Sequence, residues 1–203
     1  MKLETYIENE IIPRYLGFDR AHGPEHAKSV IDRSLKLAEI YGLDLRMVYA
    51  AAAYHDTGLA EGRERHHLVS GRIIREDRML REWFTEEQIE TIAEAAEDHR
   101  ASAAREPRSI YGRVLAEADR QIDPELTVRR TVQYGLSHYP EMGKEEHWRR
   151  MLEHLQEKYA EGGYLKLLIP ESDNARRLEE LRSLMKDRSR LREIFEKEYS
   201  EGA

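Results

Sequence analysis

A histidine and an aspartate stand side by side at the end of an unusually apolar run. His55 and Asp56 directly follow Met47–Tyr54, a segment rich in alanine. A polar or charged pair at the end of a buried helix is unfavourable unless something satisfies it. A divalent metal ion would do so. The pair therefore indicates metal-dependent chemistry.

Further histidines and aspartates lie on expected helices on both sides of this pair. Imidazole and carboxylate ligands together suit several divalent metals, and a set with several of each can hold two ions that share a carboxylate. Antiparallel packing of successive helices can bring such ligands together near the helix ends. We expect one or two divalent ions (Fe, Mn, Ni, Co, Zn or Mg). The candidate ligands are His26, His55, Asp56, His66 or His67, His99 and Asp119.

The order of these residues and their flanking sequences resembles the HD superfamily of metal-dependent phosphohydrolases. The resemblance covers roughly residues 20–125 and rests on five short motifs. These are His26-Ala27-Lys28-Ser29-Val30, Ala53-Tyr54-His55-Asp56-Thr57-Gly58, His67-Leu68-Val69-Ser70-Gly71, Asp98-His99-Arg100 and Leu115-Ala116-Glu117-Ala118-Asp119-Arg120.

The resemblance implies a role for each candidate ligand. Its specific part is a quartet, of which His26, His55 and Asp119 would bind the first ion. Asp56, the fourth member, would bridge two ions when two are present. The second ion would be bound by the additional histidines, which are His67 and His99. We favour His67 over His66 because Ser70-Gly71 follows it with the spacing of the family.

Cationic residues beside these ligands are candidates for phosphate binding, since a guanidinium can pair with two phosphate oxygens at once. We expect Arg65 and Arg100 to hold substrate phosphate and to act in catalysis together with Asp56, and Lys28 to assist in binding. In a chain this rich in charge, each cation could equally be a solvated helix residue. His22 lies four residues before His26. Contact with a metal ligand or with substrate, on the one hand, and plain surface exposure, on the other, are equal alternatives for it.

The expected reaction is hydrolysis of a phosphoester or phosphoanhydride bond, in a nucleotide or another small phosphorylated metabolite. The segment Arg100-Ala101-Ser102 stands where cyclic-di-GMP phosphodiesterases have Gly-Tyr-Pro, which argues against that activity. Two other classes remain open. One is a nucleotide-binding or regulatory protein that retains metal without turnover, and the other is a helical interaction protein with structural metal.

Composition narrows the class of protein further. The chain has 36% charged residues and a net charge of −7, with lysines and arginines interleaved with acids, so double-stranded nucleic acid is a poor partner. There is no cysteine, which excludes disulfides and thiolate zinc sites. No apolar run approaches the roughly 20 residues that span a bilayer, and the start lacks a signal-peptide core. We therefore expect a cytoplasmic protein without a membrane partner.

Helical periodicity dominates, so the expected fold is all-α, an HD-domain helical bundle with additional C-terminal helices. Residues 1–140 would form the core that carries the metal site. Residues 141–203 would form an extension packed on that core or on a second subunit, as in a homodimer. The expected helices span residues 2–14, 24–41, 45–58, 66–78, 86–99, 108–122, 124–138, 144–160 and 174–199.

Overall fold

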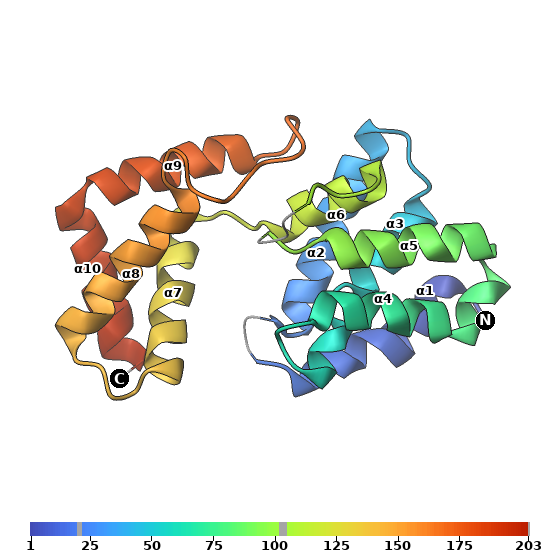
Figure 1. Cartoon of the computed structure of the whole chain (residues 1–203), viewed down its shortest axis with the longest axis horizontal. Helices are drawn as coiled ribbons and strands as arrows, with labels where there is room; N and C mark the ends of the chain where they lie inside the picture. The colour runs from blue at the N-terminus through green and yellow to red at the C-terminus, as the bar shows by residue number, and fades with distance from the viewer. Residues whose placement is uncertain (20–21, 102–104, 203) are drawn as a thin grey trace. The chain divides into compact units, whose positions relative to one another are not determined.

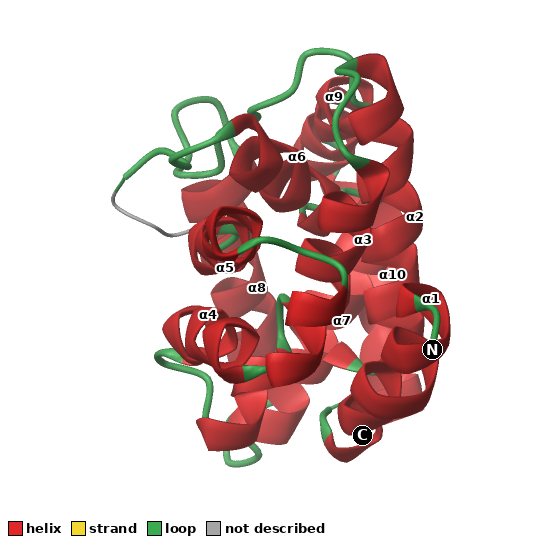
Figure 2. Ribbon diagram, turned by 90° about the vertical axis from the view of Figure 1, so that its right-hand side faces the viewer, coloured by secondary structure: helices red, strands yellow, loops and turns green. Residues whose placement is uncertain are grey.

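The computed structural model describes residues 1–19, 22–101 and 105–202, and within these ranges it contains helices and no strand (Figure 2). The all-α prediction is confirmed. The α-helices are α1 (Leu3–Tyr6), α2 (Pro24–Ile40), α3 (Leu45–Tyr54), α4 (His66–Glu76), α5 (Glu86–Asp98), α6 (Ile110–Asp119), α7 (Pro124–His138), α8 (Lys144–Tyr159), α9 (Asn174–Lys186) and α10 (Arg188–Gly202).

The chain divides into two compact units, Met1–Arg120 and Gln121–Ala203 (Figure 1). The expected boundary at residue 140 is wrong, because α7 packs against α8, α9 and α10 and so belongs to the second unit. Local sequence marks where α7 begins but carries no information on which helices it contacts.

The first unit is built around α3, which is buried on nearly all sides. Its residues Ala50, Ala51, Ala52 and Ala53 are all 2% exposed or less. Alanine favours the helix and has no bulk beyond Cβ, so neighbouring helices can approach closely. Helices α2, α5 and α6 pack against α3. The candidate ligands His26, His55, His99 and Asp119 lie on these four helices or directly after them.

Short-range signals determine where several helices begin. Pro24 occupies the first turn of α2, and the Asp44 side chain accepts hydrogen bonds from the backbone at the start of α3. Thr85 and Gln88 form a capping box at α5, and Asp123 caps α7. Each bond satisfies an amide group that the first helical turn leaves without a partner.

The second unit has a hydrophobic core of its own. The expected helix over 174–199 is instead two helices, because the backbone turns at Asp187, whose carboxylate accepts a hydrogen bond from the Arg190 amide. Apolar residues of this segment contribute to the core. The buried cluster is formed by Val128, Val132, Met151, Leu155, Leu191, Ile194 and Phe195.

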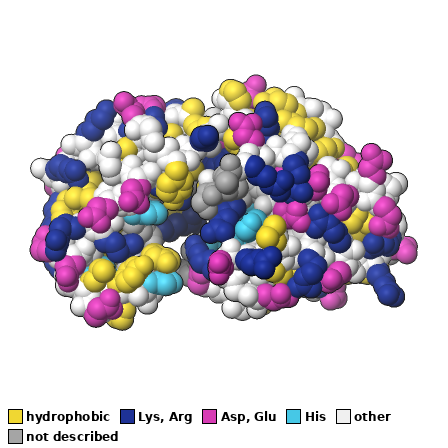
Figure 3. Space-filling model, in the orientation of Figure 1, with side chains coloured by type: hydrophobic (Ala, Val, Ile, Leu, Met, Phe, Trp, Pro, Cys, Tyr) yellow, Lys and Arg dark blue, Asp and Glu magenta, His cyan; other side chains and the backbone are white. Residues whose placement is uncertain are grey.

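Cationic and acidic side chains are interspersed on the face of the molecule shown in Figure 3. This mixture agrees with the interleaved charges of the sequence. Within the described ranges, no helix is both long enough and apolar enough to cross a membrane.

Candidate metal centre

Helix α3 ends in a turn whose carbonyl groups are bonded by side chains. The last turn of any helix leaves carbonyls without intrahelical partners. Here the Nδ1 of His55 donates to the Ala52 carbonyl at 2.7 Å, and the Thr57 hydroxyl donates to the Tyr54 carbonyl at 2.7 Å. The helix therefore stops just before Asp56, and a short 3-10 helix, Thr57–Glu61, follows.

A first cluster of ligand atoms forms where α2, the end of α3 and the end of α6 meet. The Nε2 atoms of His26 and His55 are 3.3 Å apart. The Oδ1 of Asp119 lies 3.2 Å from the His26 Nε2 and 3.8 Å from the His55 Nε2. His26, His55 and Asp56 offer ligand atoms within 4.8 Å of one another, a geometry that could hold a metal ion.

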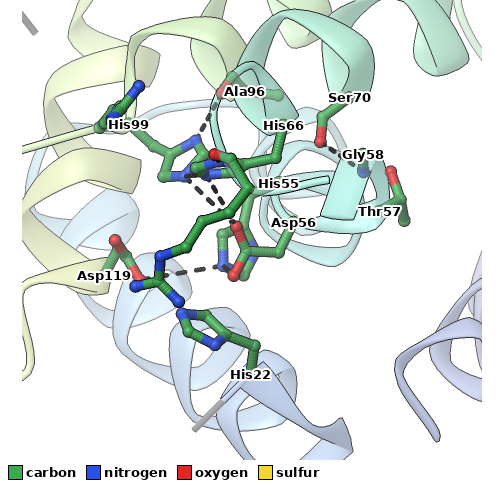
Figure 4. A network of polar contacts seen from close by, with 12 residues as sticks. His22, His55, Asp56, Thr57, Gly58, His66, Ser70, Ala96, His99 and Asp119 are labelled. Atoms are coloured by element: carbon green, nitrogen blue, oxygen red, sulfur yellow. Dashed lines mark hydrogen bonds and ion pairs between the residues drawn. The ribbon is translucent and has the colours of Figure 1, made fainter. Parts of the chain in front are cut away.

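A second cluster joins the same aspartate to the start of α4 and the end of α5. The Nε2 atoms of His66 and His99 are 3.2 Å apart. They lie 3.3 Å and 3.5 Å from the Oδ1 of Asp56. Asp56, His66 and His99 form a second group that could hold an ion, and Figure 4 shows these three side chains pointing towards one another.

Asp56 is shared between the clusters through its two carboxylate oxygens. Its Oδ2 lies 3.3 Å from the His55 Nε2 and 3.7 Å from the His26 Nε2, whereas its Oδ1 faces the second cluster. The side chain is only 4% exposed. A buried carboxylate with one oxygen towards each group is the arrangement that a bridging ligand requires.

Three of the histidines are oriented by the same local contact. The Nδ1 of His55, His66 and His99 each lies within 2.8 Å of the backbone carbonyl three residues earlier. A carbonyl oxygen can only accept, so each Nδ1 carries a proton and each neutral ring has its lone pair on Nε2. This contact directs Nε2 into the clusters, as is usual for histidines that bind metals.

The facing Nε2 atoms explain why a cation fits here. At 3.2 Å, the Nε2 lone pairs of His66 and His99 repel each other unless a positive charge or a proton lies between them. The buried carboxylate of Asp56 supplies negative charge beside them. A divalent ion with imidazole and carboxylate ligands meets both conditions, so the residues present fit a metal site.

The carboxylates of the clusters are held in the ionised form. Burial raises the pKa of Asp56 and of Asp119, but the adjacent histidines outweigh it and hold both pKa values well below the ordinary range. Burial lowers the pKa of His55, yet the charge of Asp56 raises it to about 9. Burial and the charge of His99 lower the pKa of His66 to about 4. His66 is therefore neutral, while His55 must release a proton to bind a metal.

His66 takes the place that we expected for His67. Helix α4 begins at His66, whose ring reaches Asp56 and His99. The His67 ring centroid lies 5.6 Å from that of His66, and His67 belongs to neither group of ligand atoms. One step along a helix turns a side chain by about 100°. The two positions therefore face different neighbours, and the structure brings His66, not the expected His67, to the second cluster.

Two of the residues expected to contact substrate, His22 and Arg100, are held by polar contacts with nearby residues. The Nδ1 of His22 bonds the Asp19 carboxylate at 2.8 Å, and its ring lies 5.9 Å from that of His26. Arg100 donates from Nη1 to the Glu64 carbonyl at 2.8 Å. Figure 4 shows His22 at the edge of the network.

Lys28 and Arg65 are both exposed. Arg65 directly precedes His66, so it remains a candidate for substrate binding. Lys28 follows His26 by two residues on α2, which places the two side chains on nearly opposite sides of the helix. The structure therefore does not bring Lys28 to the clusters.

Sequence reasoning missed the residues that allow α4 to approach Asp56. The hydroxyl of Ser70 accepts a hydrogen bond from the Gly58 amide at 2.9 Å. A Cβ on Gly58 would overlap the His66 carbonyl oxygen and lie 2.7 Å from the Ser70 amide nitrogen. Glycine just after the His-Asp pair was a visible signal, since it often marks a close backbone approach.

Asp98, which precedes His99, also has a structural role that the sequence analysis did not identify. Its carboxylate accepts from the backbone amide of Arg108 at 2.7 Å and from the Arg108 side chain, and it pairs with Arg105 at 2.9 Å. These contacts hold Arg105 and Arg108 against the end of α5. The high charge of the segment concealed this role.

Comparison with known proteins agrees with this architecture. Residues 24–121 match the HD domain family. The fold is similar to the crystal structure of a predicted HD superfamily hydrolase from an uncultured Thermotogales bacterium. That likeness has a TM-score of 0.50 and 20% sequence identity, and it covers 75% of this chain and 90% of the other. A search of curated proteins found no match.

The matched span contains His26, His55, Asp56 and Asp119, which the structure brings together at the first cluster. Residues 24–121 therefore form an HD domain. The likeness to the solved structure concerns the fold, because the two sequences are only 20% identical.

Proposed function

We propose that this HD-domain protein is a metal-dependent phosphohydrolase that cleaves a phosphoester or phosphoanhydride bond of a nucleotide or another small phosphorylated metabolite. The observation that carries the proposal is the pair of ligand groups that share Asp56. His26, His55 and Asp119 would hold one ion, and His66 and His99 would hold the other. The family match and the similar fold of a predicted hydrolase support the assignment.

Bound divalent ions lower the pKa of a coordinated water and withdraw charge from phosphoryl oxygens. The residues of the chain orient the reacting groups around them. Asp56 fixes the separation of the two groups through its two oxygens. Nδ1–carbonyl bonds hold the rings of His55, His66 and His99, so little reorganisation is needed when substrate binds.

The phosphate contacts are proposed for arginines that flank the second cluster. Arg65 precedes His66 and Arg100 follows His99, so both backbones lie beside ligands. Arg100 uses one terminal nitrogen for the Glu64 carbonyl, and its remaining N–H groups can pair with phosphate oxygens. His22, held by Asp19, is a further candidate for substrate contact.

A metabolite screen tests the proposal. Purified protein is incubated with nucleotides and other phosphorylated metabolites in manganese, nickel, cobalt, iron or magnesium, and products are measured. Turnover that disappears on chelation and in Asp56→Asn is the expected result. Nucleotide binding without turnover in all five metals would support the regulatory alternative. Neither binding nor turnover would contradict both.

A further inference from the structure

Tyr15 lies outside the matched HD domain but contacts the residue shared by the two clusters. It belongs to a short 3-10 helix, Ile12–Gly17, and its side chain is fully buried. The matched domain begins only at residue 24. A buried tyrosine hydroxyl needs a hydrogen-bond partner, and the partners of Tyr15 are backbone groups of the turn that carries Asp56.

The Tyr15 hydroxyl uses both its donor and its acceptor function in this turn. It donates to the carbonyl of Ala53 at 2.8 Å and accepts from the amide of Asp56 at 3.2 Å. Both backbone groups are buried in the first unit. One side chain thus bridges two positions that an α-helix would have bonded to other backbone groups.

The Ala53 carbonyl and the Asp56 amide would have other partners if α3 continued, and the Tyr15 hydroxyl takes the place of those partners. If α3 continued, the Asp56 amide would donate to the Ala52 carbonyl, and the Ala53 carbonyl would accept from the Thr57 amide. The His55 Nδ1 bonds the Ala52 carbonyl instead, and Tyr15 bonds the Ala53 carbonyl. Tyr15 thereby stabilises the turn against further helix, and this turn aims the Asp56 carboxylate.

We propose that Tyr15 is a positioning residue for the metal centre, holding the backbone of Asp56 so that one carboxylate oxygen faces each cluster. The inference rests on the proposed metal site. It extends that site to the segment before the HD domain, to which Tyr15 belongs. Outer groups that orient a ligand typically contribute about 10-fold to 100-fold to metal affinity.

The experiment compares Tyr15→Phe with Tyr6→Phe in the full chain. Tyr6 lies in the same N-terminal segment, and its hydroxyl donates to Asp77 at 2.7 Å, away from the clusters. Each variant loses one tyrosine hydroxyl and keeps its ring. Binding of Co²⁺ is followed by visible absorption, which reports affinity and ligand geometry, and folding is followed by circular dichroism.

Tyr15→Phe should bind Co²⁺ at least about 10-fold more weakly, with an altered absorption spectrum, while Tyr6→Phe should stay within about twofold of wild type. Equal affinity and spectra in Tyr15→Phe and wild type would overturn the positioning role and leave the metal site intact. Absence of Co²⁺ binding by wild type would instead overturn the proposed function and this inference with it.

If Tyr15→Phe fails to fold, a second pair of variants tests the same proposal. Tyr15→Gln retains a donor and an acceptor, whereas Tyr15→Leu has neither, and both lose the ring. Tighter Co²⁺ binding by the glutamine variant is expected, since its amide can replace part of the bridge. Equal binding by the two would contradict the proposal.

Discussion

The Nε2 atoms of His66 and His99 lie 3.2 Å apart, although the rings come from the start of α4 and the end of α5. Both rings donate from Nδ1 to a carbonyl three residues earlier. Their lone pairs therefore face each other beside the buried Asp56 carboxylate. This arrangement of ligand atoms could hold a cation, and it distinguishes His66 from its neighbour His67 on α4.

His66→Ala should remove the second ion, whereas His67→Ala should leave metal content unchanged. The Nε2 of His66 lies 3.3 Å from the Asp56 carboxylate, whereas His67 belongs to neither group of ligand atoms. Elemental analysis after gel filtration in manganese measures the number of ions per chain. The adjacent histidine is a matched control for helix position and residue type. Loss of metal in His67→Ala alone would restore our original assignment.

Asp56→Asn should reduce metal content at both clusters while preserving helicity. The substitution keeps the size of the side chain but removes the charge that both groups share. Metal content by elemental analysis and helicity by circular dichroism check the result. Two tightly bound ions in the variant would contradict a bridging role.

Gly58→Ala should destabilise the first unit by about 1–3 kcal/mol, the usual cost of overpacking. The added methyl would meet the backbone of His66 and of Ser70, which must then shift away from residue 58. Urea denaturation in a chelator measures the loss of stability. Metal analysis should show depletion of the second ion.

Gly17→Ala is the matched control for this substitution. Nothing lies within 4 Å of a Cβ built on Gly17, and its φ is not positive. Its free energy of unfolding should stay within about 0.5 kcal/mol of wild type. Similar losses in both variants would show that close packing at Gly58 is not the cause.

Arg100→Ala should weaken substrate binding without removing metal. Its guanidinium follows His99 and is anchored by the Glu64 carbonyl. A contact made equally in the ground state and transition state would raise KM alone, while a contact made only in the transition state would lower kcat. Steady-state kinetics at equal metal occupancy distinguish these cases. Unchanged kcat and KM would make Arg100 a solvated residue at a helix end.

The stability of the second unit should fall as the pH falls from about 6.5 to 4. Burial, with the charges of Lys158 and Arg150, lowers the pKa of His154 in the folded chain from 6.5 to about 4. Between these values the unfolded chain takes up a proton that the folded chain does not, so the free energy of unfolding decreases. Above this range the residue is neutral in both states and has no effect.

This pH dependence can be measured in a Trp83→Phe background, in which Trp148 is the sole tryptophan and reports on the second unit. Urea denaturation at pH 7 and pH 5 gives the two free energies. His154→Gln should make their difference smaller, because the titrating group is gone. An unchanged difference would assign the effect to other groups.

Much of the architecture could be predicted because helices carry local signals. Asp44, Thr85 and Asp123 cap helices, and all three are residue types that favour the position before a helix. Ligands near helix ends, such as His55 and Asp119, do meet in space. These features depend on neighbouring residues and on the helical repeat, which are both visible in sequence.

Contacts between distant segments could not be predicted in the same way. The bond from Tyr15 to Asp56 crosses 41 residues, and nothing in the local sequence of either residue indicates it. Similarly, Asp123 marks the start of α7 but not the unit in which that helix packs. The choice between His66 and His67 depended on one residue of helix phase, which is smaller than the uncertainty of a helix boundary read from sequence.

The shared carboxylate makes the two clusters thermodynamically dependent on each other. An ion at one oxygen of Asp56 would restrict rotation of the carboxylate and so reduce the entropy that the other ion must overcome, while the two positive charges oppose simultaneous occupancy. The sum of these two opposing effects is the coupling free energy between the two ions. Thermodynamic linkage requires this coupling free energy to be the same whichever ion binds first. A metal titration should therefore depart from the curve of two independent sites, and the sign of the departure would show whether ordering or repulsion is larger.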